Sequence, residues 1–308
     1  MNIALVTPAG SGSRAGNRHT ALRWAGFLRK AGHAVSVMQQ WRPDPRTELL
    51  LALHARRSHD SIKAFAHAHP GRPLILALTG TDIYRDLDHS AEARESLRLA
   101  SRFIVLQREA LSRLSKSRRP LAHVVIQSSS TLLRHRPVKR GFRVSVIGHL
   151  REEKDPLRAL HALDHVSRDL GIEVLQVGAS LDPRLERDSR PGYRRVGGVP
   201  HARALAWLAS SHAMVISSRM EGGANVVSEA IRIGVPVLAS RIPGNVGLLG
   251  RGYPAYFPVG NERALARLMT RAATDADFYR QLKLHIATLR PLVAPASESR
   301  MLLAALRG

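Results

Sequence analysis

One βαβ unit can be read directly from residues 213–239, which read AMVISSRMEGGANVVSEAIRIGVPVLA. An apolar strand is predicted at residues 213–216, followed by a glycine-rich loop. A helix then starts near Asn225 and ends at Gly234, and a second apolar strand follows it. Parallel strands joined by a helix are the building block of α/β sheets. The stretch therefore predicts an α/β fold.

Two carboxylates, Glu221 and Glu229, lie in this unit. The first is in the loop, beside the backbone N–H groups that open the helix, and the second is about one turn into the helix. Backbone N–H groups at a helix start bind phosphate, and carboxylates bind hydroxyls. Because a nucleotide sugar offers both groups, the unit predicts a nucleotide-sugar site. The alternative is a surface unit whose two acids are merely solvated.

Short apolar runs alternate with helical stretches along the rest of the chain, in two series. A boundary is predicted in the polar, basic stretch Ser130–Gly141. Two doubly wound domains are therefore expected, with ligands outside the carboxyl ends of the strands. The first series of predicted strands covers residues 3–7, 34–38, 49–53, 74–77, 103–106 and 124–126, and the second covers 143–147, 173–177, 193–196, 214–216, 235–239 and 256–258.

Composition narrows the function classes. The 308 residues carry a formal charge of +23, and only six of the cations are lysines. Scattered arginines with few aromatics argue against nucleic-acid binding, which is not expected. No cysteine is present, so disulfides, thiolate metal sites and thiol nucleophiles are excluded. No membrane span and no signal peptide are predicted, and the cytoplasm is the expected location.

The Glu221–Glu229 segment resembles the Glu-x7-Glu signature of retaining GT-B glycosyltransferases. The resemblance implies the GT-B fold, with two facing Rossmann-like domains, here residues 1–135 on the acceptor side and 136–290 on the nucleotide-sugar side. Residues 291–308 would form a helix that crosses back to the first domain. The resemblance also implies that Glu221 meets the donor sugar and Glu229 the ribose. The remaining donor-binding residues of this loop would be Gly222, Gly223, Ala224 and Asn225.

The loop after the first strand of the second domain resembles the family's diphosphate-binding loop, in which an Arg and a Lys hold the donor. Lys154 matches the family Lys, whereas His149 occupies the Arg position and Arg151 follows two residues later. Which cation replaces the Arg is left open. Positive groups at this place stabilise the negative charge that grows on the leaving diphosphate. Lys154, Arg151 and Glu221 are therefore the predicted catalytic residues, and His149 is a predicted donor ligand.

Two loops of the first domain are predicted to bind the acceptor. The glycine-rich loop of residues 7–20 fits a dinucleotide fingerprint only formally, because it is long and the next strand ends without an acid for a ribose. It resembles the GT-B acceptor-side loop instead. The second loop, residues 79–85, contains small residues that let the backbone approach a ligand. Its aspartate, Asp82, could instead merely cap the following turn. The predicted acceptor-binding residues are Gly12, Asn17, Arg18, His19, Asp82 and Arg85.

No cofactor and no metal site are expected. The sequence contains fifteen histidines, but the four at His54, His59, His67 and His69 form no i, i+4 pair around a carboxylate, and they are interpreted as helix-surface residues. No Asp-x-Asp motif ends a strand, so Mg²⁺ chelation of the diphosphate is not predicted. No Walker loop or Gly-x-Ser-x-Gly elbow occurs either.

Several segments together resemble a narrower group, the selenosugar synthases of selenoneine biosynthesis. They are residues 16–24, 78–85, 218–226 and 242–250. The resemblance implies that the partners are selenophosphate and a UDP-sugar, UDP-N-acetylglucosamine or UDP-glucose, and that a C–Se bond forms with loss of UDP and phosphate. Two alternatives stay open. One is a conventional transferase acting on a hydroxyl of a lipid or small metabolite, and the other is a non-catalytic binder of anions or nucleic acid.

Overall fold

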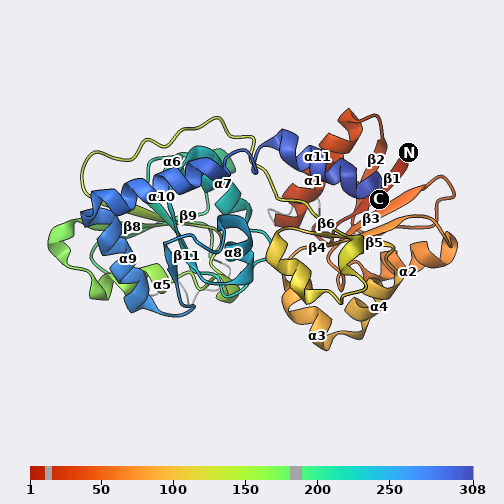
Figure 1. Ribbon diagram of the computed structural model, residues 1–308, viewed down its shortest axis with the longest axis horizontal. Coiled ribbons are helices and arrows are strands. Elements are labelled where there is room, and N and C mark those ends of the chain that lie inside the picture. The colour runs from red at the N-terminus through yellow and green to blue at the C-terminus, as the bar shows by residue number, and fades with distance from the viewer. Residues whose placement is uncertain (11–15, 181–188, 308) are drawn as a thin grey trace. The chain divides into compact units, whose positions relative to one another are not determined.

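The computed structural model describes residues 1–10, 16–180 and 189–307, and it divides the chain into two compact units (Figure 1). The first unit comprises residues 1–127, 221–223 and 295–308, and the second comprises residues 128–220 and 224–294. The chain thus passes from the first unit to the second after Gln127, eight residues before the predicted end of the first domain. The basic stretch Ser130–Gly141 belongs to the second unit.

The first unit is built on a parallel six-stranded sheet with the strand order β2-β1-β3-β4-β5-β6. This is a doubly wound order, in which the chain reverses direction across the sheet between β1 and β3. The strands are β1 Asn2–Val6, β2 Ala34–Met38, β3 Leu49–Leu53, β4 Leu74–Leu78, β5 Arg102–Val105 and β6 Ala122–Val124.

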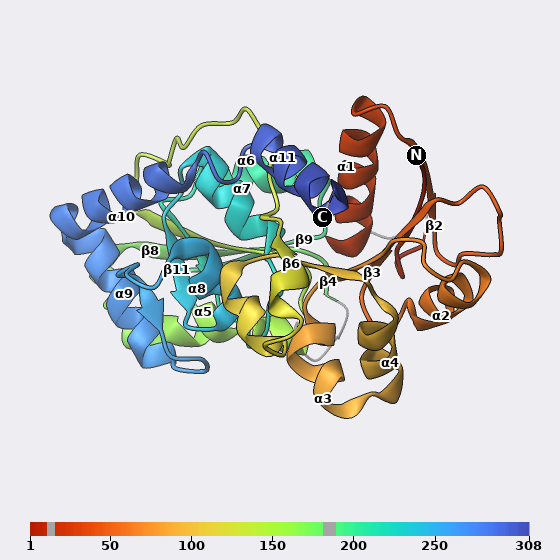
Figure 2. The ribbon, with the colours of Figure 1, turned by 45° about the vertical axis from the view of Figure 1, so that its right-hand side comes forward.

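Helices cover both faces of this sheet, which explains why β3 and β4 are continuous apolar runs rather than alternating ones. One face packs against α2 and α4 through Ile62, Phe65 and Leu97. The other packs against α1 and α11 through Trp24 and Leu302 (Figures 1 and 2). The helices are α1 Gly16–Lys30, α2 His59–Ala68, α3 Leu87–His89, α4 Ala91–Leu99 and α11 Pro295–Arg307, with short turns η1 Asp82–Asp86, η2 Arg108–Arg113 and η3 Arg119–Leu121.

The last helix of the chain, α11, packs on the first unit and is tied to α1 by a buried carboxylate. Glu298 is fully buried, and it accepts hydrogen bonds from Arg23 Nε at 2.7 Å and from Trp24 Nε1 at 2.7 Å. A second Arg23 nitrogen donates to the other carboxylate oxygen at 3.1 Å. A buried charge is tolerated only when it is paired in this way.

The second unit holds another parallel six-stranded sheet, with the strand order β12-β11-β10-β7-β8-β9. This is the Rossmann order, with its reversal between β7 and β10. The strands are β7 Phe142–Ile147, β8 Ile172–Val177, β9 Tyr193–Gly197, β10 Ala213–Ile216, β11 Val237–Ser240 and β12 Tyr256–Phe257. The helices and turns are η4 Glu152–Lys154, α5 Arg158–Ala162, η5 Leu163–His165, η6 Arg168–Leu170, α6 His201–Ala209, α7 Asn225–Ile233, α8 Pro243–Leu249, α9 Glu262–Thr274 and α10 Ala276–Leu289.

Two predicted strands lie elsewhere than expected. Strand β6 ends at Val124, where the prediction began, because the buried Val125 and Ile126 continue as irregular chain after the pairing with β5 ends. Strand β11 begins at Val237 rather than at Val235. Pro236 has no N–H to donate to a neighbouring strand, so it precedes the ladder.

Candidate functional site

In the second sheet, β7 and β10 are neighbours at the point where the strand order reverses, the usual ligand position of doubly wound sheets. The loop that follows β7 carries His149, Arg151 and Lys154, and the loop that follows β10 leads to α7. The fold therefore places the predicted diphosphate loop beside the segment that opens the Glu229 helix.

Contacts with the β10 loop fix the backbone around Lys154. The Ser217 hydroxyl donates to Asp155 O at 2.7 Å and lies 3.1 Å from Lys154 O, and Arg219 N donates to Glu153 O at 2.9 Å. Asp155 itself has a left-handed backbone with φ of 45°. A small pocket of about 20 Å³ is lined by His149, Lys154 and Ser217, among others. The Lys154 ammonium is thereby carried by a rigid turn at the carboxyl end of the sheet.

His149 is half-buried, and among the described residues its Nδ1 is buried without a hydrogen-bond partner. Arg151 is exposed. Burying a polar nitrogen unpaired costs free energy unless a ligand or water satisfies it. The two candidates for the family Arg position therefore differ. His149 has a buried ring nitrogen without a hydrogen bond in the described structure, whereas Arg151 is exposed to solvent.

Glu229 lies on α7 and is engaged by a histidine. His201, the first residue of α6, places Nε2 2.8 Å from Glu229 Oε1. The hydrogen bond to Glu229 raises the pKa of His201 above its usual range. The Glu229 side chain is only 14% exposed, whereas the histidine is 60% exposed. His201 was not predicted from the sequence, because its position at a helix start carries no motif.

The loop before α7 contains the other predicted donor ligands. Ala224 precedes the helix in extended conformation and has no side-chain oxygen that could cap the first N–H groups. No acidic residue occurs in the first turn of α7. A helix start without a capping side chain leaves its N–H groups available to an anion. Glu221, Gly223 and Asn225 are half-buried, and Gly222 is buried.

The acceptor residues predicted at the start of α1 follow strand β1 in the first unit. Asn17 and Arg18 are half-buried, and His19 is exposed. Arg18 Nε is buried and makes no hydrogen bond within the described part of the chain. Gly12 lies outside the described residues. In the first turn of α1, the Thr20 hydroxyl donates to Gly16 O at 3.0 Å.

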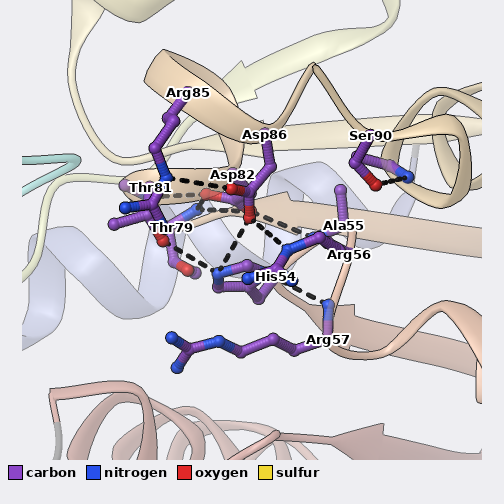
Figure 3. Close-up of polar contacts among 12 residues, drawn as sticks. His54, Ala55, Arg56, Arg57, Thr79, Thr81, Asp82, Arg85, Asp86 and Ser90 are labelled. Atoms are coloured by element: carbon purple, nitrogen blue, oxygen red, sulfur yellow. Dashed lines mark hydrogen bonds and ion pairs between the residues drawn. The ribbon is translucent and has the colours of Figure 1, made fainter. Parts of the chain in front are cut away.

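The structure gives Asp82 a role inside the fold. Its side chain is fully buried, and the carboxylate accepts hydrogen bonds from Thr79 N at 2.9 Å, Gly80 N at 2.7 Å and Ala55 N at 3.1 Å (Figure 3). These bonds clamp the loop after β4 to the loop after β3. The Asp82 carboxylate, which was predicted to bind the acceptor, thus accepts backbone N–H groups and holds the surrounding loop in place.

At the carboxyl end of β3, beside the reversal of the first sheet between β1 and β3, lies a residue that the sequence interpretation misplaced. His54 follows β3, is buried, and has a left-handed backbone with φ of 78°. Its Nδ1 accepts from Arg57 N at 3.3 Å, so in the neutral ring Nε2 carries the proton and donates to Thr81 Oγ1 at 3.0 Å (Figure 3). Burial lowers the pKa of His54, which favours that neutral ring.

The interpretation of the histidines as helix-surface residues is therefore wrong for two of them. His54 terminates a strand, and His59 is a buried residue of α2 whose Nδ1 lies 3.1 Å from Ser96 Oγ. The signal that could have found His54 is its place directly after an apolar strand. A non-glycine residue with positive φ at such a strand end often accompanies a functional site.

Arg85 is partly exposed to solvent and also forms an ion pair within the first unit. Its side chain is 44% exposed, and Nε donates to Asp86 Oδ1 at 3.2 Å. Asp86 also accepts from Arg56 Nε at 2.9 Å, and its other neighbours include His54 at 3.9 Å (Figure 3). Two guanidinium groups, those of Arg56 and Arg85, thus contact one buried carboxylate beside the carboxyl ends of β3 and β4.

The described residues contain neither a group of metal-binding side chains nor a membrane-spanning helix. No group of three histidine, cysteine or acidic side chains there could hold a metal ion. No helix within the described ranges combines the length and the apolar character needed to cross a membrane.

Part of the sequence is similar to known glycosyltransferases. Residues 141–275 match the family model described as glycosyl transferases group 1. The chain is also 25% identical over 269 residues to glycosyltransferase 1 domain-containing protein 1 of Xenopus tropicalis. This match covers 76% of the present chain and 77% of the Xenopus protein.

Solved structures share the fold over the full chain. HepE of Anabaena, in complex with UDP and glucose, superposes with a TM-score of 0.77 at 17% identity, covering 100% of this chain and 99% of HepE. Sucrose-phosphate synthase of Thermosynechococcus elongatus superposes with a TM-score of 0.77 at 15% identity, covering 99% and 98% of the two chains. The architecture is therefore GT-B, as predicted.

Proposed function

We propose that this glycosyltransferase of GT-B fold transfers the sugar of a UDP-sugar, UDP-N-acetylglucosamine or UDP-glucose, to selenophosphate. Selenium attacks the anomeric carbon, the C–Se bond forms, and the bond from that carbon to the diphosphate oxygen breaks, which releases UDP. Water then cleaves the Se–P bond, so that phosphate leaves and the selenol stays on the sugar. The enzyme would therefore be a selenosugar synthase.

The observation that carries the donor half is the convergence of Lys154 and the start of α7 at the β7/β10 reversal of the second sheet. The uncapped helix start would receive the diphosphate, with Gly222, Gly223, Ala224 and Asn225 in the loop around it. Glu229 would bind the ribose hydroxyls after exchanging its contact with His201. HepE, a structural neighbour, was solved in complex with UDP-glucose.

Lys154, helped by Arg151 and His149, would stabilise the leaving diphosphate. Fixed cations contribute most where negative charge develops in the transition state. Glu221 would hold the sugar hydroxyls as the anomeric carbon is attacked. We propose that these cations suffice and that no metal ion is needed. If EDTA inhibits strongly and Mg²⁺ restores the rate, the diphosphate is neutralised in another way.

Selenophosphate suits the acceptor half because it is an anionic, polarisable nucleophile that needs no strong general base. It needs a cradle of cations and N–H groups instead. Arg18, with a buried Nε unsatisfied within the described residues, is one candidate donor to its phosphate oxygens, and Arg85 is another. Asn17 and His19 flank Arg18 in the first turn of α1. The segment around Arg18 is also one of those that resemble the selenosugar synthases.

The test is a product assay with the purified full chain. The protein is incubated with each UDP-sugar and selenophosphate, and separately with thiophosphate and with candidate alcohols, and mass spectrometry follows UDP and the sugar products. We expect a seleno-sugar from selenophosphate, and slower or no reaction with the less nucleophilic thiophosphate. Arg18→Ala should raise the KM for selenophosphate and leave UDP affinity nearly unchanged.

Efficient glycosylation of an alcohol without any seleno-sugar would replace this proposal by a conventional hydroxyl-directed transferase. UDP affinity, measured by calorimetry, separates the two halves of the proposal. If UDP binds and no acceptor reacts, the acceptor assignment fails. If UDP does not bind to the folded protein, the donor assignment fails.

A further inference from the structure

Three segments of the second unit meet at the carboxyl end of α7, far along the chain from one another. Ser129 N donates to Val293 O at 3.1 Å, and His135 N donates to Ile233 O at 3.2 Å. Arg290 Nη2 donates to the same Ile233 carbonyl at 2.9 Å. Residues 129–135, 232–233 and 290–293 therefore lie side by side.

Leucines stand exposed on these segments. Leu132 is 86% exposed, the highest value among the large hydrophobic side chains of the described residues, and Leu292 and Leu133 are 43% and 39% exposed. Leu132 and Leu133 lie between the two backbone anchors at residues 129 and 135. Thr131 braces this run, since its Oγ1 accepts from Leu133 N at 3.2 Å. The leucines are thus held outward by an ordered, hydrogen-bonded stretch.

Arginines surround the leucines, and no acid offsets them in the contributing segments. Residues 128–141, 230–236 and 280–295 contain no Asp or Glu. Burial and the nearby charges of Arg134 and Arg232 lower the pKa of Arg290, whose Nε is buried without a hydrogen-bond partner in the described structure. These three guanidinium groups lie near one another, and within the described residues none of them forms an ion pair with a carboxylate. Their positive field is therefore not offset by a paired acid.

We propose that this Leu–Arg patch, made of Leu132, Leu133, Arg134, Arg232, Arg290 and Leu292, docks the enzyme on an anionic lipid bilayer. The leucine side chains enter the boundary between headgroups and acyl chains, and the arginines pair with lipid phosphates. Surface binding of this kind needs no membrane-spanning helix.

Two other occupants fit the surface less well. A second copy of the chain would bring the same uncompensated arginines together across a symmetric contact, where like charges repel. Single-stranded nucleic acid is bound by basic grooves interleaved with aromatic side chains. No Phe, Tyr or Trp occurs in residues 128–141, 230–236 or 280–295. Exposed aliphatic side chains beside arginines match a bilayer instead.

The experiment is a vesicle flotation assay with the full-length protein. Vesicles of phosphatidylcholine alone are compared with vesicles that also contain phosphatidylglycerol, at low and high salt. We expect binding only to the anionic vesicles. The double variant Leu132→Ser/Leu133→Ser should weaken that binding roughly tenfold or more, because buried aliphatic area is lost. The variant Arg134→Gln/Arg232→Gln should weaken it to a similar extent and reduce its dependence on salt.

A control removes an exposed leucine and an exposed arginine from the first unit. Leu121 is 45% exposed and Arg98 is an exposed residue of α4, so Leu121→Ser/Arg98→Gln should bind anionic vesicles like the unaltered protein. A tryptophan reporter sharpens the test. The emission of Leu132→Trp should shift to shorter wavelength on anionic vesicles, and that of Leu121→Trp should not.

Several results would overturn the proposal. One is binding to anionic vesicles that the leucine variant leaves unchanged, since charge alone would then explain it. Another is tighter binding to a DNA oligonucleotide than to vesicles, which assigns the arginines to nucleic acid. A third is concentration-dependent dimerisation without vesicle binding, which assigns the leucines to a second copy of the chain.

Discussion

His201 and Glu229 form an ion pair whose strength depends on pH. The hydrogen bond to Glu229 raises the pKa of His201, so the pair is strongest below the usual histidine pKa of 6.5 and is lost as pH rises through the raised value. If Glu229 binds the ribose, the protonated histidine competes with the ribose hydroxyls. We expect UDP affinity, measured by calorimetry, to rise with pH across the titration of His201.

The matched variant is His201→Gln, which keeps a polar side chain but cannot titrate. UDP's own phosphate titration is common to both proteins, so the difference between their pH profiles reports the histidine. A profile as steep in His201→Gln as in the unaltered protein would contradict the competition.

Glu229→Ala should lower UDP affinity, measured by calorimetry, roughly tenfold or more, since it removes charge-assisted hydrogen bonds of about 1.5–3 kcal/mol each.

Replacing Lys154 tests whether the predicted diphosphate loop stabilises the transition state. Lys154→Ala should lower kcat on the order of 100-fold and weaken UDP-sugar binding much less, because the negative charge on the leaving group grows during the reaction. Steady-state and single-turnover kinetics separate the two effects. Lys139→Ala, an exposed lysine of the same unit, is the control. An equal loss in ground-state affinity and in turnover would make Lys154 a binding residue only.

The sequence predicts Lys154 and Glu229 as site residues because they match motifs of the family that the chain resembles, and their roles stay predictions. Residues defined only by tertiary contacts carry no such motif. The sequence drew attention to Asp82 but did not predict its hydrogen bonds. The backbone N–H groups that its carboxylate accepts belong to two loops, and only the fold brings Ala55 beside Thr79. His54 was missed because the same pattern fits a helix-surface histidine.

At the scale of elements, the contact between the ends of β7 and β8 depends on a glycine. A Cβ added to Gly178 would lie 1.9 Å from Gly148 O, and the residue has φ of 151°. Gly178→Ala should therefore lower the free energy of unfolding by about 3 kcal/mol or more, through both the clash and backbone strain. Chemical denaturation measures the loss.

Gly148→Ala separates the two causes. Gly148 has a similar φ of 143°, but an added Cβ there has no atom within 4 Å. That variant should lose only the strain term, about 1–2 kcal/mol. Equal losses in the two variants would show that backbone conformation, and not the steric contact, makes Gly178 necessary.

The elements themselves were largely readable from the sequence, and their ends were not. Buried parallel strands such as Leu49–Leu53 are continuous apolar runs between polar loops, which is a strong local signal. The edge strand β6 gave a weaker one, because the apolar run from Val124 to Ile126 continues beyond the point where pairing with β5 ends. Where a ladder stops depends on its neighbour, and a single segment does not contain that information.

At the scale of the whole molecule, the fold brings the last helix onto the first. The predicted helix of residues 291–308 begins at Pro295, and its packing on α1 buries Leu302 and Leu306 in the core of the first unit. The apolar residues of this helix could be recognised in the sequence. The resemblance implied that this helix returns to the first domain, and residues 295–308 do belong to the first unit. The side chains that Glu298 binds could not be predicted, since this buried residue looks like any other acid in an amphipathic helix.

Glu298 therefore provides the sharpest test of how the chain's end stabilises its beginning. Glu298→Ala leaves Arg23 and Trp24 without their acceptor in a buried place, which typically costs about 3–5 kcal/mol for a buried ion pair. We expect a loss of that size in the free energy of unfolding of the first unit, followed by denaturant titration of the Trp24 emission. Arg300→Ala, an exposed residue of the same helix, should change it by less than about 0.5 kcal/mol. If Glu298→Ala is as stable as Arg300→Ala, the leucines alone hold α11 on the first unit, and the buried carboxylate fixes only its register against α1.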